Sequence, residues 1–279
     1  MSETTHFVEA RKRDWRLSAG LALTGSFVVC ALLSLVWTPY DVTALDIAAK
    51  LGGFSRAHWL GTDALGRDVV SLLMAGARNS LAVAVSSAVL GLVVGTPLGL
   101  LAAAKRGIID ELVMRANDIV FAFPAVLLAI MLAAVLGPGA RNAVIAIGLF
   151  NVPVFARVTR GAALAQWSRD YVLAARLAGK DSARISLEHI LPNVANVLIV
   201  QATIQISIGI IAEAGLSYIG LGVQPPAPSW GRMLNEAQTL IGIDPWLAVI
   251  PGLAIVFAVL GLSLLGEALR LRLDPRATA

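Results

Sequence analysis

The feature that most constrains the fold is a set of apolar runs without charge, each a candidate membrane crossing. Residues 17–37 contain no Asp, Glu, Lys or Arg, and at 1.5 Å per residue a run of that length crosses roughly 30 Å of hydrocarbon. The chain is 57% hydrophobic and 14% charged, whereas soluble domains are about 25% charged. The sequence therefore predicts an all-α membrane protein with six transmembrane helices. The five further runs are residues 81–104, 119–136, 142–156, 194–212 and 246–266.

The first run follows a polar segment, residues 1–16, that ends in four basic residues. A basic start before an apolar run is also typical of a signal peptide. This run is longer than the usual signal-peptide core and shows no small-residue cleavage site at its end. We therefore expect an uncleaved anchor, followed by a long external loop that extends to residue 80.

The distribution of basic residues predicts the orientation. With the N-terminus taken as cytoplasmic, sixteen of the 22 Lys and Arg residues fall on the cytoplasmic side, as the positive-inside rule requires. Both termini are then cytoplasmic, with residues 273–279 as the C-terminal tail. The net charge of +4 is explained by this orientation, so we expect no nucleic-acid partner.

A basic, soluble-looking stretch at residues 171–193, called here the elbow, lies between two apolar runs. The spacing of Val172, Ala175 and Gly179 predicts a short helix with a small-residue face turned toward a partner outside the chain. Gly179 is suited to end that helix, and Asp181 to cap the next one. Pro192 is expected to kink or restart the chain where it re-enters the membrane.

The elbow resembles the cytoplasmic loop of ATP-binding-cassette importer permeases. The family pattern is Glu-Ala-Ala, three residues, Gly, nine residues, Ile, one residue, Leu-Pro. Leu173 replaces the usual Glu, and His189 replaces the usual Ile. The matching positions are Ala174, Ala175, Gly179, Leu191 and Pro192.

Three more segments, residues 58–81, 213–234 and 251–276, resemble the dipeptide, oligopeptide and nickel branch of these permeases. From the residues themselves we expect an interfacial helix near the end of the external loop, which either contacts a delivery protein or packs as a lid. For residues 213–234 we expect a rigid loop with Trp230 as an interfacial anchor.

The resemblance implies a type I importer permease fold in the bacterial inner membrane, with a core bundle over residues 81–272. It also implies a paralogous permease subunit, two ATPase subunits and an extracytoplasmic solute-binding protein as partners, besides the surrounding membrane lipid. ATP and Mg would be used by the ATPases, and this chain would bind no cofactor. A coupling helix near residues 169–182 would dock on an ATPase. The docking residues are expected to be Tyr171, Leu173, Ala174, Ala175, Gly179, Leu191 and Pro192.

Gln201, Gln205, Gly209 and Glu213 lie four residues apart, in the run at 194–212 and just beyond it, so three polar side chains share one helix face with a glycine. Such groups are unfavourable in hydrocarbon, so this face should turn toward protein or water. Gln201, Gln205 and Glu213 are predicted to line a polar solute path, and the alternative is that they join neighbouring helices. Another stripe, Gly91, Gly95 and Gly99, predicts close helix packing.

Enzyme motifs are absent: there is no GxxxxGK[ST] phosphate loop and no HExxH, so this chain is not expected to hydrolyse ATP itself. The three scattered histidines and single cysteine do not suggest a metal site. Asp118, Glu213 and Glu267 could in principle relay protons, so an ion-coupled secondary transporter without an ATPase is the alternative. The favoured function is a permease subunit that moves a small solute, such as a di- or oligopeptide, nickel chelate, opine or glutathione, by alternating access.

Overall fold

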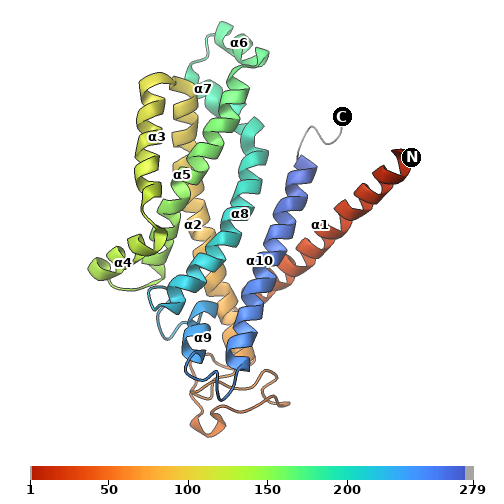
Figure 1. Cartoon of the computed structure of the whole chain (residues 1–279), viewed down its shortest axis with the longest axis vertical. Helices are drawn as coiled ribbons and strands as arrows, with labels where there is room; N and C mark the ends of the chain where they lie inside the picture. Colours follow the sequence, from red (N-terminus) through yellow and green to blue (C-terminus); the bar gives the residue numbers. More distant parts are fainter. Residues whose placement is uncertain (1, 274–279) are drawn as a thin grey trace.

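The computed structural model describes residues 2–273, and long helices dominate it (Figure 1). Five helices in the described residues are long and apolar enough to cross a membrane, and a bent pair provides a sixth crossing if it is counted as one span. The helices are α1 (Ser2–Leu33), α2 (Val69–Lys105), α3 (Gly107–Ala122), α4 (Ala125–Leu136), α5 (Ala140–Trp167), α6 (Asp170–Leu177), α7 (Ser182–Ile185), α8 (Leu191–Tyr218), α9 (Trp230–Ala237) and α10 (Trp246–Leu273). A 3-10 turn lies at Ile47–Ala49, and a π turn at Ser186–Ile190 joins α7 to α8.

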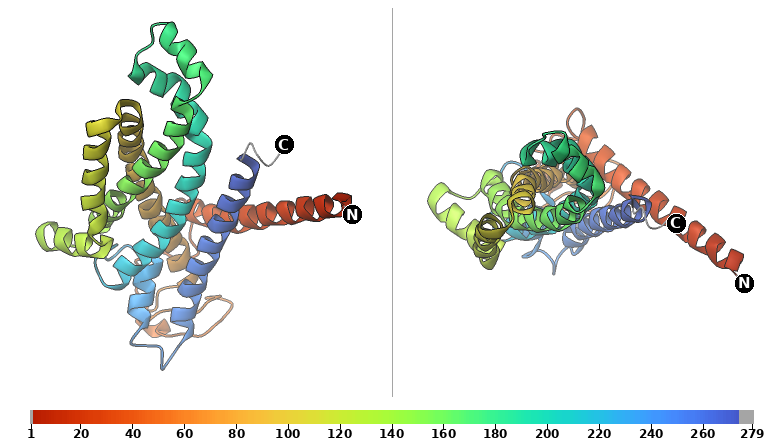
Figure 2. Two further views of the ribbon diagram at one scale, coloured as in Figure 1. Left: turned by 45° about the horizontal axis from the view of Figure 1, so that its top comes forward. Right: turned by 90° about the horizontal axis from the view of Figure 1, so that it is seen from above.

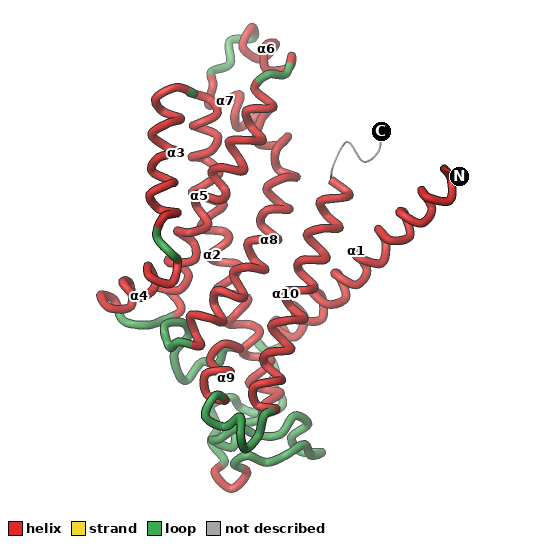
Figure 3. Tube along the Cα trace, viewed as in Figure 1, coloured by secondary structure: helices red, strands yellow, loops and turns green. Residues whose placement is uncertain are grey.

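The molecule has two distinct ends. Most loop residues gather at the end that carries α9, whereas α6 lies at the opposite end (Figure 3). The first residues of α1 and the last described residues of α10 lie toward the α6 half (Figure 1). The N-terminal half of α1 projects away from the other helices (Figure 2). The predicted tail at 273–279 lies, apart from Leu273, outside the described residues.

The centre of the bundle is the packing of α2 against α5. An added Cβ on Gly91 would collide with Asn151, on Gly95 with the backbone of Val152, and on Gly99 with the backbone of Ala156. The predicted small-residue stripe is therefore confirmed, because only glycine allows the two backbones to approach this closely.

Residues 119–136 do not form one kinked helix. The chain stops being helical at Phe123 (φ −88°, ψ 120°), and α3 and α4 meet at a bend of 77°. Pro124 explains the break, since a proline pushes the preceding residue into extended conformation and supplies no backbone donor. The prediction of a kink at Pro124 was correct in position and too small in extent. Pro153, in contrast, lies inside an unbroken α5.

The predicted interfacial helix before the second span is wrong. Residues 69–80 are the first turns of α2 itself, which begins where the side chain of Asp68 accepts a hydrogen bond from the Ser71 backbone N at 2.8 Å. No proline occurs before Pro97, and the helix continues from this cap through the second apolar run to Lys105. The connection between α1 and α2 therefore ends at residue 68.

Trp230 is a core residue, not an interfacial anchor. It is 3% exposed, and its Nε1 donates to the Leu73 carbonyl at 3.0 Å. Its ring lies 5.3 Å from that of Phe27 on α1. The loop around it is also shorter than predicted, because α8 continues to Tyr218 and α9 begins at Trp230 itself.

Candidate functional site

The elbow forms as its capping residues predicted. Gly179 takes a left-handed conformation (φ +78°), with the Lys180 N donating to the Ala175 carbonyl at 3.1 Å and the Gly179 N to that of Arg176 at 2.9 Å. These two bonds satisfy the last carbonyls of α6. Asp181 then accepts from the Arg184 N at 2.9 Å and caps α7. Both predicted roles, for Gly179 and Asp181, are confirmed.

The face that α6 turns outward is not the predicted one. Val172 and Ala175 are buried against Ile185 and Ile190 in the chain's own core, so the prediction that they form the outward surface is wrong. Leu173 and Leu177 are exposed, Leu177 at 91%. Both faces of α6 carry apolar residues at helical spacing, so spacing alone could not decide which one the rest of the chain covers.

The other predicted docking residues take different positions. Ala174, Gly179 and Pro192 are exposed, whereas Leu191 and Tyr171 are half-buried. The Tyr171 hydroxyl donates to Gln166 Oε1 at 2.9 Å, and burial raises the pKa of this phenol. It therefore remains a neutral donor that fastens α6 to the end of α5.

A cluster of charges joins the turn after α6 to the π turn. Glu188 accepts from Lys180 Nζ and from Arg184 Nε, each at 2.6 Å. Lys180 Nζ also lies 2.9 Å from Nε2 of His189, the residue found where the resembled family has Ile. Single exposed ion pairs contribute little, but these share Glu188 and add to the buried contacts beneath α6.

The chain does not restart at Pro192. Residues 182–218 form one continuous helical segment that passes through the π turn and into α8. Pro192 has no backbone donor for the carbonyl four residues earlier, and a wider turn at this point accommodates that loss. The elbow is thus connected to a membrane-length helix without a loop between them.

The predicted polar stripe on α8 separates into two parts. Gln205 is 4% exposed and donates to Asn151 Oδ1 on α5 at 2.7 Å. Glu213 is fully buried and accepts from the Ser217 hydroxyl at 2.6 Å. Only Gln201, which lies 3.4 Å from Gln205 Oε1, also lines a groove. Sequence reasoning missed Asn151, although an amide within an apolar run was an available signal.

That groove runs between α5, α8 and α10, in the half of the molecule that carries the elbow, and has a volume of about 450 Å³. An adjoining hollow of about 220 Å³ shares Val200, Ile204 and Arg270 with it. The groove is lined by Val158, Asn196, Val197, Val200, Gln201, Ile204, Arg270 and Leu273. From the sequence, Arg270 was counted only among the basic residues that predict the orientation in the membrane, and no role was predicted for Asn196.

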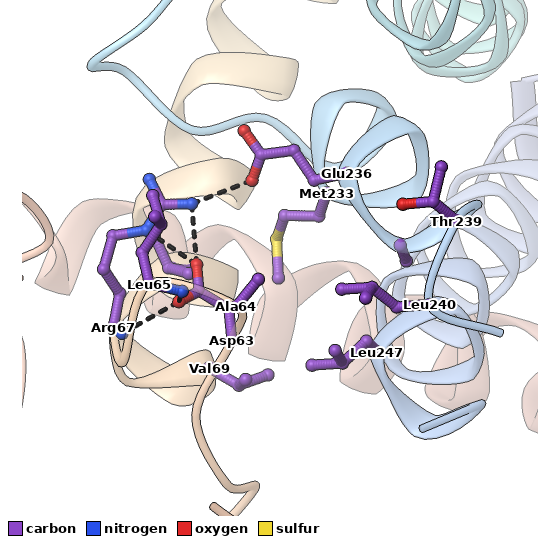
Figure 4. Close-up of a pocket in the computed structure, with 12 residues that line it drawn as sticks. Asp63, Ala64, Leu65, Arg67, Val69, Met233, Glu236, Thr239, Leu240 and Leu247 are labelled. Carbon is purple, nitrogen blue, oxygen red and sulfur yellow. Dashed lines mark hydrogen bonds and ion pairs between the residues drawn. The ribbon is translucent and has the colours of Figure 1, made fainter. Parts of the chain in front are cut away.

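A pocket of about 310 Å³ lies at the opposite end, between the end of the long connection and α9 (Figure 4). Arg67 bridges Asp63 Oδ2 at 2.6 Å and Glu236 Oε2 at 2.8 Å. The floor is apolar and includes Met233 and Leu240. This arrangement ties the connection between α1 and α2 to α9.

Two of the three acids considered for a proton relay form ion pairs, whereas Glu213 Oε2 is buried without a hydrogen-bond partner among the described residues. Asp118 pairs with Arg157 Nη2 at 2.7 Å, and Glu267 pairs with Arg16 on α1. Within the described residues no group of His, Cys, Asp and Glu is arranged to hold a metal ion. A helical bundle with a surface elbow fixed to a polar-striped, membrane-length helix defines a membrane-embedded transport subunit.

Comparison with known proteins gives the family. The model of the binding-protein-dependent transport system inner membrane component matches residues 95–279, and the chain belongs to that family. It is a multi-pass permease subunit of an ATP-binding-cassette importer in the bacterial inner membrane. The resemblance noted in the sequence is confirmed, and the ion-coupled alternative receives no support.

Named relatives span nearly the whole chain. A glutathione transport system permease protein, GsiD, of Pectobacterium atrosepticum is 42% identical over 257 residues, covering 90% of this chain and 85% of the relative. A dipeptide transport system permease protein, DppC, of Alkalihalophilus pseudofirmus is 39% identical, covering 95% and 87%. A di/tripeptide permease protein, DppC, of Pseudomonas aeruginosa is 43% identical, covering 92% and 87%.

Among solved structures, the fold resembles a chain of the MetNI methionine ABC transporter, with a TM-score of 0.61 and 21% identity. The match covers 73% of this chain and 96% of that one. This likeness places the bundle among the type I importer permeases by fold alone.

Proposed function

We propose that this chain carries small peptides, from dipeptides to glutathione, across the inner membrane by alternating access. The support is chemical continuity among its relatives, whose names specify dipeptides, di/tripeptides and glutathione at 39–43% identity over at least 90% of this chain. The partners would be a paralogous permease subunit, two ATPases that use ATP and Mg, and an extracytoplasmic solute-binding protein.

The topology proposed is cytoplasmic for residues 1–16, the elbow and the tail at 273–279. The 17–80 segment contains the first span and an external connection, and this connection ends at residue 68, just before α2 begins. The core bundle occupies residues 81–272. Two observations support this topology. Basic residues are in excess on the side assigned to the cytoplasm, and the start of α1 and the end of α10 lie in the same half of the molecule as α6 (Figure 1).

The observation that carries the coupling proposal is the two-sided character of α6. Its inner residues, Val172 and Ala175, pack against Ile185 and Ile190 at the start of the segment that continues as α8. Its outer residues, Leu173 and Leu177, are exposed. An ATPase that holds the outer face would therefore move α8 with it.

Within this scheme the predicted docking residues divide by position. Leu173, Ala174 and Gly179 are on the surface that an ATPase would touch. Tyr171, Ala175 and Leu191 would position that surface from beneath. Pro192, which is exposed at the start of α8, remains a candidate docking residue. For the solute path we assign Gln201. Gln205 would hold α8 against α5 through Asn151 and so define the wall of the path, whereas Glu213 is buried and bonds to Ser217 within α8.

The test is Leu177→Asp in the complete transporter. Because this side chain is 91% exposed, the change should leave insertion and folding intact. Burial of a leucine contributes about 1.5–3 kcal/mol, so its loss should weaken ATPase association by roughly 10- to 150-fold. ATP-dependent uptake should fall with it.

The matched control is Ile243→Asp, another exposed aliphatic residue (71%) between α9 and α10, at the end opposite α6. It should retain the ATPase. If Leu177→Asp co-purifies a full complement of ATPase and sustains normal uptake, the outer face of α6 is not the docking surface.

A further inference from the structure

The groove between α5, α8 and α10 has the chemistry of a binding site rather than of a lipid-facing surface. Three of its lining residues are polar: Asn196 and Gln201 on α8 and Arg270 on α10. Its volume of about 450 Å³ lies in the range of 300–1,000 Å³ that is common for small-molecule sites. Polar groups at membrane depth are retained where they face protein, water or ligand.

The charge of the groove is positive. Among the described side chains, none forms an ion pair or hydrogen bond with Arg270. Glu267, the acid that lines the adjoining hollow, is held by Arg16 from α1. Arg16 thereby neutralises this acid, and the Arg270 guanidinium remains available to an anion that enters between α8 and α10.

The two amides have unused hydrogen-bonding capacity beside this charge. Gln201 makes one long contact, at 3.4 Å, to Gln205, and Asn196 makes no hydrogen bond to another described residue. Between them the α8 wall is formed by Val197, Val200 and Ile204. A guanidinium, two amides and an aliphatic wall complement a carboxylate, a peptide bond and an aliphatic side chain.

We propose that this groove is a substrate subsite in which Arg270 binds the C-terminal carboxylate of a peptide in transit. Arginine pairs with carboxylates through two parallel N–H donors. Asn196 and Gln201 form hydrogen bonds with the last peptide bond, next to that carboxylate. The side-chain wall is aliphatic and open, so the subsite recognises the backbone terminus that all linear peptides share. The proposal rests on the proposed peptide-transport function and adds a recognition group near the end of α10, in the half of the molecule that carries the elbow.

The position of the charge distinguishes this role from that of a boundary marker. Arg270 and Arg272 are both exposed and lie two residues apart on the same helix, but only Arg270 lines the groove. A charge that served only to mark the cytoplasmic boundary would give the same result at either position. The two arginines therefore form a matched pair for a test.

The experiment uses the complete transporter with its solute-binding protein in phosphatidylcholine liposomes, and the probes are alanyl-alanine and its C-terminal amide. Arg270→Gln should lower uptake of the free acid by about tenfold, the low end for a charge-assisted hydrogen bond. Uptake of the amide, which has no carboxylate, should be unchanged by the variant. Arg270→Lys should recover part of the loss, and Arg272→Gln should behave as wild type for both probes.

The outcomes separate the two levels of inference. If the wild-type transporter takes up neither probe, the peptide function itself fails and the subsite fails with it. If the wild type transports alanyl-alanine and Arg270→Gln lowers both probes equally, or neither, only the subsite is wrong. The same measurement is repeated in liposomes that also contain phosphatidylglycerol. If Arg270→Gln lowers uptake of both probes equally, and only in these liposomes, Arg270 binds a lipid headgroup and the proposal is overturned.

Discussion

The hydrogen bond between Gln205 and Asn151 permits a quantitative test of how α8 is held against α5. Both side chains are nearly inaccessible, at 4% and 2% exposure, and their bond is 2.7 Å long. Asn151 Nδ2 has no partner of its own. Removal of Gln205 therefore leaves the entire Asn151 amide buried without a hydrogen bond.

The magnitude follows from that geometry. An interhelical hydrogen bond in a membrane protein contributes about 0.6 kcal/mol on average and up to about 1.7. A buried polar group left unsatisfied adds about 1–3 kcal/mol. Gln205→Leu, which keeps the volume nearly constant, should thus lower the free energy of unfolding by about 2–4 kcal/mol.

Asn151→Ala completes a double-mutant cycle. Alanine retains the Cβ that packs on Gly91, so the change removes the amide and not the helix contact. In the double variant both amides of the Gln205–Asn151 pair are gone, so neither is left buried without a partner. The second substitution should therefore lower the free energy of unfolding by about 1 kcal/mol less than it does alone. The measurement is reversible unfolding in lipid–detergent bicelles, with the single variants compared at one lipid composition.

Gln201→Leu is the internal comparison, because this amide is half-buried and lines the groove. It should change stability by less than about 0.5 kcal/mol and lower transport instead. Additive effects of Gln205→Leu and Asn151→Ala, within the roughly 0.3–0.5 kcal/mol expected for independent sites, would refute the assignment of Gln205 to helix packing.

Two further substitutions test the packing that supports the site. Trp230→Ala should lower the free energy of unfolding by about 3–5 kcal/mol, because the indole is buried and donates a hydrogen bond to the Leu73 carbonyl. If thermal unfolding shows a change below about 1 kcal/mol, Trp230 lies at the lipid interface instead. Gly95→Ala should destabilise the bundle by roughly 1–3 kcal/mol, because the new Cβ meets the backbone of Val152. Gly161→Ala, at an exposed position on α5, meets nothing within 4 Å, and equal melting temperatures for these two variants would contradict the close packing of α2 on α5.

Local chemistry accounts for the features that could be predicted from sequence. The length of the apolar runs fixes helices across a membrane, since a backbone in hydrocarbon must satisfy its own hydrogen bonds. Gly179 and Asp181 set the turn of the elbow through conformations and caps that involve only neighbouring residues. The resemblance of four segments was sufficient to identify the family, later confirmed over residues 95–279.

Features that depend on contacts between distant residues were not predictable in this way. Trp230 has the composition of an interfacial anchor, and only the approach of α1 and α2 makes it a core residue. Val172 and Leu173 are adjacent and both apolar, yet one is buried and the other exposed because α7 covers a single face of α6.

The sequence by itself determined that this chain crosses a membrane and contains a capped elbow between two of its spans, because these properties depend on hydropathy and local backbone preference. Tertiary structure alone decided which side of the elbow is exposed and which amide on α8 lies in the core. It also decided that Arg270 and Gln201, which are about 70 positions apart in the sequence, line the same groove. The physical reason is that burial and charge compensation depend on which helices become neighbours, and that choice is made by packing across the entire bundle.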